Sequence, residues 1–494
     1  MIKYIKTSLV IFAMLIANAC TEDFAELNTN PNQLPDLDVG FQLGRAMIAS
    51  SDSRFEYWRS NLIYPTAIAQ QATNTWWTGN TYGISDQWAG AWWERYYTGY
   101  GKNLTDLIAR ADPETESNTI QAARIFRVHL FQRLTDLYGD APWFGAGKGF
   151  LEANFTPEYD TQEAIYDDLI KEVTEASAAL NESQPEVRGD VIFDGDISKW
   201  KKFANSLRLR LGMRLSEVNP AKAETEVSAA FAAGVMASLD DQPVFVHDVN
   251  FQNGNSQVVR SDHFFLHNTM VEFMKSTNDP RLTVYGGVYV DGDKIDVPVE
   301  EFYGLPLGGQ SAENPAAPEA PLARINLDHF SQLEVPYVHM RYVEVELLLA
   351  EAAARGWIAS DAAMHYEAGV TAGMKMWEIY PGNPTIADAD IAAYLAANPY
   401  DGSSLDAALE TINMQFWVSM FMNGFESYAN YRRTNIPNLA PSTHPSRAIN
   451  TVPLKMPYPV REDGDNKANF QPAVAKQNVT GTNDLSGKVW WDVN

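Results

Sequence analysis

The chain has 494 residues with 63 acidic against 37 basic side chains, which give a formal net charge of −26. Because such a surface repels polyphosphates, the composition argues against a nucleic-acid-binding function. It also disfavours anionic ligands such as alginate, although a local basic pocket could override the mean field.

The first residues predict a secretory signal peptide over 1–19. Lys3 and Lys6 form its basic region, and the apolar run at 9–16 is too short to cross a bilayer about 30 Å thick. Small residues lead directly to Cys20, the single cysteine of the chain. A lone cysteine cannot form an internal disulfide. We therefore expect Cys20 to carry a lipid, although a buried N-terminal cysteine is the alternative interpretation.

The segment after Cys20 is expected to be an anchor and extended linker over 20–38, followed by a single domain over 39–494. Prolines and asparagines at 27–32 oppose regular structure. Beyond them, apolar residues recur at helical spacing, with Thr161 and Ser198 as candidate N-caps. Helices are predicted over these ranges: 39–73, 88–111, 120–138, 161–180, 198–218, 340–355, 360–380 and 405–424.

The middle of the chain has a different character. Short β-prone runs occur at 243–249, 282–290 and 294–299, among glycine, aspartate and asparagine. A glycine- and proline-rich loop is expected at 304–321. These features predict an irregular, partly β insertion at about 240–335 on a mainly α scaffold, and an extended C-terminal segment over 435–494.

A cluster of aromatic residues between positions 72 and 100 contains the candidate ligand-binding residues. Trp76 and Trp77 lie in a stretch rich in threonine, glycine and asparagine, which predicts a loop. Exposed aromatic rings on a loop are not explained by core packing. Because flat amphipathic rings suit the C–H faces of sugars, the candidates are Trp76, Trp77, Tyr82, Asn80 and Trp88.

Neighbouring aromatic residues have the spacing of a helix face. Trp88, Trp92 and Tyr96 are four residues apart, as are Trp93 and Tyr97. An aromatic stripe of this kind is more often core, so Trp92 and Trp93 are expected to be buried. Trp88 stays a candidate because it opens the helix beside the loop.

No metal, cofactor or catalytic motif satisfies its requirements. His263 and His267 are four residues apart but lack the glutamate of a zinc protease motif, so we expect packed or solvated histidines. The sequence Asp291-Gly292-Asp293 lacks the terminal glutamate of a calcium loop and is expected to be a β-turn. With 63 acidic residues, a carboxylate pair at glycosidase spacing could arise by chance.

Eight segments, which together cover nearly the whole mature chain, carry a recognisable resemblance. They are 27–32 (LNTNPN), 126–142 (FRVHLFQRLTDLYGDAP), 200–216 (WKKFANSLRLRLGMRLS), 279–281 (DPR), 343–356 (VEVELLLAEAAARG), 366–370 (YEAGV), 415–434, which contains Glu426, and 452–460, followed by Glu462 and Asn466. In this order they resemble the SusD/RagB-type nutrient-binding outer-membrane lipoproteins of Bacteroidetes, in the SusD-like, starch-binding-associated branch.

The resemblance implies a fold in which helices pair as tetratricopeptide-like units and an irregular region carries the ligand site. The residues themselves show no repeat with a period of about 34. The resemblance also implies a partner, a SusC-like TonB-dependent transporter over which the protein closes as a lid. The acidic residues at 21–23 resemble the signal that sends such lipoproteins to the cell surface.

The expected function is therefore that of a surface-exposed, lipid-anchored protein that binds an oligo- or polysaccharide and delivers it to the transporter. A neutral glucan is the first expected ligand, with laminarin, a β-1,3-glucan, ahead of α-glucan. No enzymatic activity, cofactor or metal is expected. Two alternatives stay open: a surface glycan-degrading enzyme, and a relative that captures peptides.

Overall fold

The computed structural model describes residues 38–52, 56–261, 263–308 and 321–494. The predicted signal peptide, Cys20 and all but the last residue of the predicted linker lie outside these ranges, as does most of the loop expected at 304–321.

Helices account for most of the described chain, as the apolar periodicity predicts. Those before residue 240 are α3 (Val39–Asp52), α4 (Glu56–Trp58), η1 (Arg59–Ile63), α5 (Pro65–Ile68), η2 (Thr78–Thr81), α6 (Asp86–Ala89), α7 (Ala91–Arg95), η3 (Tyr96–Tyr100), α8 (Gly101–Arg110), α9 (Ser117–Tyr138), α10 (Gly149–Glu152), α11 (Gln162–Ala179), α12 (Ile197–Arg214), α13 (Pro220–Ala233) and η4 (Leu239–Asp241). Those that follow are α14 (Gly254–Val259), α15 (Asn268–Ser276), α16 (Arg281–Tyr285), η5 (Val299–Glu301), α17 (Leu327–Phe330), α18 (Tyr342–Ala354), α19 (Ala362–Lys375), η6 (Met376–Ile379), α20 (Asp388–Ala397), α21 (Leu405–Ser419), α22 (Gly424–Thr434), α23 (Glu462–Asp465) and α24 (Lys467–Gln477).

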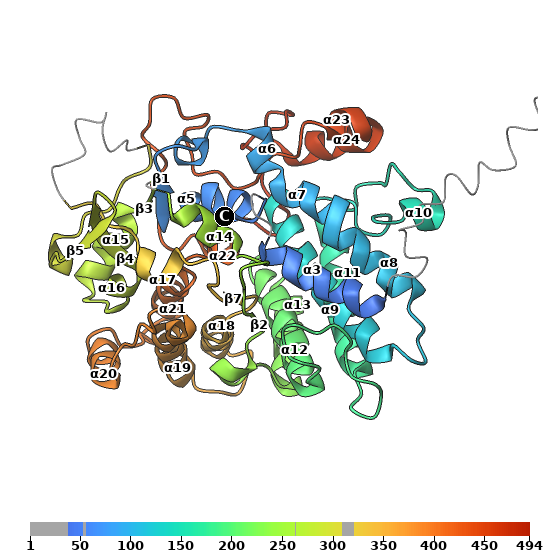
Figure 1. Cartoon of the computed structure of the whole chain (residues 1–494), viewed down its shortest axis with the longest axis horizontal. Helices are drawn as coiled ribbons and strands as arrows, with labels where there is room; N and C mark the ends of the chain where they lie inside the picture. The colour runs from blue at the N-terminus through green and yellow to red at the C-terminus, as the bar shows by residue number, and fades with distance from the viewer. Residues whose placement is uncertain (1–37, 53–55, 262, 309–320) are drawn as a thin grey trace, which may run out of the picture.

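Helices pair along the chain. α9 packs on α11, α12 on α13, and α18 on both α19 and α21. Figure 1 shows these pairs from α9 and α11 on the right, through α12 and α13, to α18 and α19 towards the lower left. The fold is thus mainly α, built on paired helices.

The strands form two small antiparallel sheets, which lie mostly in the region expected to be irregular. The larger has the order β1-β3-β6-β4-β5 and the smaller pairs β2 with β7. β4 and β5 meet at Asp291-Gly292, where both residues have positive φ, so the expected β-turn is confirmed. The bounds are β1 (Ala72–Asn74), β2 (Val244–Phe245), β3 (Phe264–Leu266), β4 (Gly286–Val290), β5 (Asp293–Ile295), β6 (Arg324–Ile325) and β7 (Tyr337–Val338).

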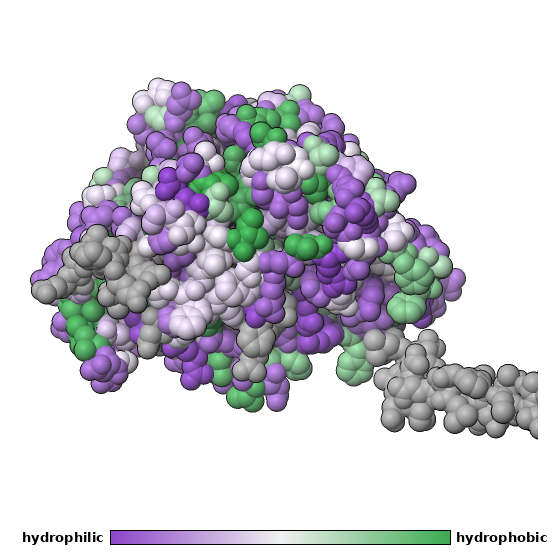
Figure 2. All heavy atoms as spheres, turned by 90° about the horizontal axis from the view of Figure 1, so that it is seen from above, coloured by the Kyte–Doolittle hydropathy of each residue, from purple (hydrophilic) through white to green (hydrophobic). Residues whose placement is uncertain are grey.

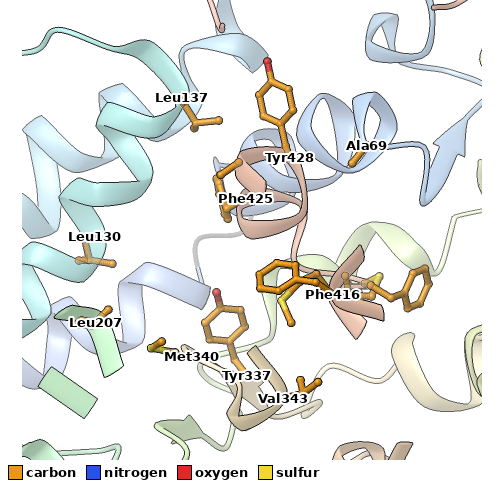
Figure 3. Packing of buried hydrophobic residues seen from close by; sticks show 14 of the residues in the cluster. Ala69, Leu130, Leu137, Leu207, Tyr337, Met340, Val343, Phe416, Phe425 and Tyr428 are labelled. Atoms are coloured by element: carbon orange, nitrogen blue, oxygen red, sulfur yellow. The ribbon is translucent and has the colours of Figure 1, made fainter. Parts of the chain in front are cut away.

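One core joins the helical scaffold to the segments above it. Leu130 and Leu137 of α9 approach Phe425 and Tyr428 of α22, with Tyr337 of β7 below them (Figure 3). Trp92 and Trp93 are buried in this core, as the helical spacing predicts. The face seen in Figure 2 is largely polar with smaller apolar patches.

Several predicted helices differ from the observed ones. The range 39–73 contains several separate helices and ends in β1. One of the breaks lies at Pro65, which has no N–H to continue a helix and opens α5 instead. The range 88–111 is broken at Gly90 and at Gly99, whose backbone is not helical. Asp196, not Ser198, caps α12 by accepting from the Lys199 amide at 3.0 Å. Thr161 caps α11 as predicted.

Two regions expected to be irregular contain helices. α23 and α24 lie within 435–494, so this segment is not extended throughout. The first half of the β-prone run 282–290 belongs to α16. Both errors arise where tertiary contacts decide the local structure, since α24 contains Pro472 and would be read as a loop from its sequence.

Candidate functional site

Trp76 and Trp77 open onto a surface pocket of about 450 Å³. The turn that leaves β1, the residues that enter β3, and α14 with its flanks form most of it, and Trp58 of α4 and Leu333 complete it. Its described lining residues are Trp58, Trp76, Trp77, Gln252, Gln257, Val258, Arg260, Ser261, His263 and Leu333.

The pairing of β1 with β3 sets the two tryptophans beside His263. The ladder continues past Asn74, because the Thr75 amide donates to the His263 carbonyl at 3.0 Å. The ring centroids of Trp76 and His263 are 5.1 Å apart. The two strands thus bring together aromatic residues that are far apart in the sequence.

The two tryptophans have different surroundings. Trp76 exposes 70% of its surface, the value of a residue outside the core. Trp77 is half-buried, since its ring stacks on Phe264 at 5.2 Å and meets the edge of Trp58 at 5.0 Å. Trp76 therefore offers a free ring face, whereas Trp77 joins the pocket to the core.

Polar contacts fix the turn that carries both rings. The Asn74 carboxamide oxygen accepts from the Trp77 amide at 2.7 Å, and Asn80 donates to the Asn74 carbonyl at 2.6 Å. Gly79 passes so close to Ile63 that a Cβ would lie 1.8 Å from the Ile63 carbonyl oxygen. A turn held in this way pre-organises its rings, which lowers the entropy that a ligand must pay to order them.

The other predicted site residues do not line the pocket. Tyr82 is fully buried, and its hydroxyl accepts from the Ser442 amide at 3.2 Å. Burial raises the pKa of Tyr82 to about 12. Asn80 is buried beneath the turn, and Trp88 is half-buried on α6 outside the pocket. The structure thus unites Trp76 with Trp77, and gives Tyr82 and Asn80 the role of supports.

Sequence reasoning missed most of the polar lining. Gln252, Gln257 and Arg260 come from α14 and its flanks, about 180 positions after the tryptophans. No local pattern marks these residues, because only the β1–β3 pairing brings them near. His263 is packed, as expected, and its ring contacts both indole rings. His267 is buried, and this burial lowers its pKa to about 3.

The described residues contain no cluster of three histidine, cysteine or acidic side chains that could hold a metal ion. Over the same ranges, none of the helices has the length and apolar character needed to cross a bilayer.

The comparisons with known proteins decide the family. Residues 40–459 match the profile of a SusD-like family described as "Starch-binding associating with outer membrane". The chain belongs to this SusD-like family. No curated protein sequence matches it.

Solved structures of SusD-like proteins share the fold. One, called a chitin-binding protein, is 35% identical with a TM-score of 0.81, over 92% of this chain and 100% of the other. A Bacteroidetes SusD-like protein, AC2a, is 29% identical with a TM-score of 0.83, over 93% and 100%. A chitin-binding SusD homolog from Flavobacterium johnsoniae is 23% identical with a TM-score of 0.77, over 92% and 98%, and shows the fold alone.

Proposed function

We propose that this SusD-like protein is a non-catalytic lipoprotein of the outer-membrane surface that captures a neutral glycan. Trp76 and Trp77 are its binding platform, Cys20 carries its lipid, and a SusC-like TonB-dependent transporter receives the glycan. The observation that carries the proposal is the exposed Trp76 ring, fixed beside Trp77 at the rim of a pocket.

The pocket has the chemistry that a sugar needs. A pyranose ring presents C–H groups that pack on an indole face, and its hydroxyls need amide partners at the edge. Gln252 and Gln257 supply such amides, and the Gln257 amide reaches the Gln252 oxygen at 3.3 Å. The remaining donors and acceptors of both amides can serve a ligand.

Two neutral glycans are candidates for the ligand. The aromatic richness and negative charge of the sequence favour a neutral glucan, and the family resemblance puts laminarin first among these. Chitin follows from the 35% identical relative called a chitin-binding protein. Both are β-linked and uncharged, so the platform proposal covers either one.

Affinity electrophoresis tests the proposal directly. Native gels would contain laminarin, glycol chitin, starch, xylan, mannan or alginate, and retardation by a neutral polymer is expected. Retardation by alginate alone would contradict the proposal. A reducing-end assay on the same mixtures is expected to detect no release, whereas release would favour the glycan-degrading alternative.

Trp76→Ala is expected to weaken binding of the retarding glycan by about 1–3 kcal/mol, the usual cost of losing an aromatic anchor. The free energy of unfolding is expected to stay within about 0.5 kcal/mol, because an exposed ring leaves no cavity. Isothermal titration and urea unfolding measure the two quantities. Phe41→Ala is the matched control, since Phe41 is 74% exposed outside this pocket. Equal binding by Trp76→Ala and wild type would place the platform elsewhere.

Cys20→Ala is expected to leave the protein folded but to remove it from the membrane fraction, because the lipid supplies its hydrophobic anchor. Fractionation of a strain without the transporter, followed by immunoblotting, measures the distribution. If the variant still sediments with the outer membrane there, the lipoprotein assignment is wrong.

A further inference from the structure

We infer that Arg260 selects the ligand, by donating to an acyl oxygen carried by the sugar ring, and that the preferred ligand is a β-linked N-acetylhexosamine glycan. This inference rests on the proposed function, since it assigns a ligand class and a specificity residue to the same pocket. It is carried by the juxtaposition of Arg260 with the Trp76–Trp77 pair.

Arg260 is a cationic side chain at the pocket wall. Its side chain is exposed, and within the described ranges no residue forms a hydrogen bond or ion pair with its guanidinium. Other arginines of the chain are engaged: Arg210 with Glu344, Arg214 with Glu426, and Arg433 with Glu351. As far as the described residues are concerned, the Arg260 guanidinium thus keeps its donors available to a ligand.

The backbone that carries Arg260 is held in place. Asn253 caps α14 by accepting from the amides of Asn255 and Ser256, and its own amide donates to the Leu333 carbonyl at 2.8 Å. After the helix, the Ser261 hydroxyl donates to the Val258 carbonyl at 2.7 Å. Arg260 therefore faces the tryptophan pair from a fixed element.

The charge of the pocket differs from that of the whole chain. Among the described lining residues there is no aspartate or glutamate, whereas Arg260 is cationic. The guanidinium has only donors. A ligand that uses this wall must offer an acceptor oxygen.

Hydroxyl oxygens of any sugar can accept, but they also donate, which the guanidinium cannot use. The substituents whose oxygens only accept are the acetamido carbonyl, which is neutral, and the anionic uronate carboxylate and sulfate ester. The net charge of −26 opposes the approach of a polyuronate from a distance. An acetamido group is neutral and escapes this repulsion, while its methyl can lie on the apolar wall of Val258. The observations therefore favour the acetamido group.

Three oligomers with one β-1,4 backbone test the inference on the full chain in detergent: cellohexaose, chitohexaose and a β-1,4-glucuronan hexamer. Wild type is expected to bind chitohexaose at least tenfold more tightly than cellohexaose. Arg260→Ala is expected to lose that preference by weakening chitohexaose about tenfold, with cellohexaose within twofold. Arg260→Lys is expected to be intermediate, because lysine keeps the charge but not the planar fork.

Arg110→Ala is the charge-matched control, since Arg110 is an exposed arginine on α8 outside the pocket, and it is expected to bind like wild type. Equal wild-type binding of chitohexaose and cellohexaose, or a preference that survives Arg260→Ala, would overturn the inference. A wild-type preference for the glucuronan that Arg260→Ala removes would also overturn it in favour of a uronate. In each of these three outcomes, Trp76→Ala is still expected to weaken binding if the proposed function is right. If Trp76→Ala binds like wild type, the tryptophan platform itself is wrong.

Discussion

Replacing Trp92 by alanine is expected to lower the free energy of unfolding by about 3–5 kcal/mol. Trp92 is 1% exposed, and its ring lies against Phe425 at 5.0 Å and Tyr100 at 5.5 Å. Its indole N–H also donates to the Leu130 carbonyl at 3.3 Å. Truncation removes these contacts and leaves a cavity where α7, α9 and α22 meet. Urea unfolding followed by circular dichroism measures the loss.

Trp76→Ala is the comparison for this result, because it removes the same side chain from the surface. A loss below about 1 kcal/mol for Trp92→Ala would mean that the site collapses around the missing ring. Trp77→Ala should fall between the two, since the half-buried Trp77 ring contacts both Phe264 and Trp58. This differs from the sequence interpretation, in which Trp77 is a loop residue like Trp76.

Periodicity predicts the long helices well and the short ones poorly. The stripe at 120–138 matches α9 (Ser117–Tyr138), because many consecutive turns repeat one apolar face. α13 (Pro220–Ala233) went unpredicted, since its alanine-rich sequence has little contrast between faces. Short helices such as α4 and α5 depend on the surrounding core for their stability.

The candidate site is predictable only in part, and for a physical reason. Loop composition identifies Trp76 and Trp77, but the same composition surrounds Tyr82, whose ring faces the interior. An amphipathic aromatic side chain can be exposed on a loop or buried against the core, so the sequence does not distinguish these two arrangements. Arg260 reaches the pocket through strand pairing between distant segments, which no local pattern encodes.

Buried charges between helices were also invisible to the apolar pattern. Arg433 of α22 donates two hydrogen bonds to Glu351 of α18, at 2.6 and 2.7 Å, and Arg355 donates a third at 2.9 Å. Asn413 of α21 donates to the same carboxylate at 3.3 Å. One acidic side chain therefore links α18, α21 and α22.

The Glu351 carboxylate stays ionised in this buried network. Burial by itself raises the pKa of Glu351, but the guanidinium groups of Arg433 and Arg355 outweigh it and bring the pKa to about 2. The pKa of Glu351 is thus lower in the folded protein than its value of about 4.5 in an unfolded chain. The interaction of ionised Glu351 with the two arginines therefore stabilises the fold fully above about pH 4.5. The stabilisation is lost as the pH falls towards 2.

Glu351→Gln is expected to lower the free energy of unfolding by about 3–5 kcal/mol at pH 7, because it leaves the buried Arg433 charge without its partner. Relative to wild type, the deficit is expected to shrink by about 3 kcal/mol between pH 5 and pH 2, as the wild-type carboxylate takes up a proton. Urea unfolding of both proteins at several pH values in this range measures the deficit. Because the deficit is a difference between the two proteins, the titration of groups that they share cancels.

Glu272→Gln is the matched control, since Glu272 pairs with Lys275 at the surface of α15 and is 60% exposed. Exposed pairs contribute about 0–1 kcal/mol, so this variant is expected to follow wild type at every pH. A deficit for Glu351→Gln that does not change with pH would show that the wild-type carboxylate is not the titrating partner of Arg433. A deficit no larger than that of the control would show that the neutral amide serves the network equally well, and that the three helices are held by apolar packing alone.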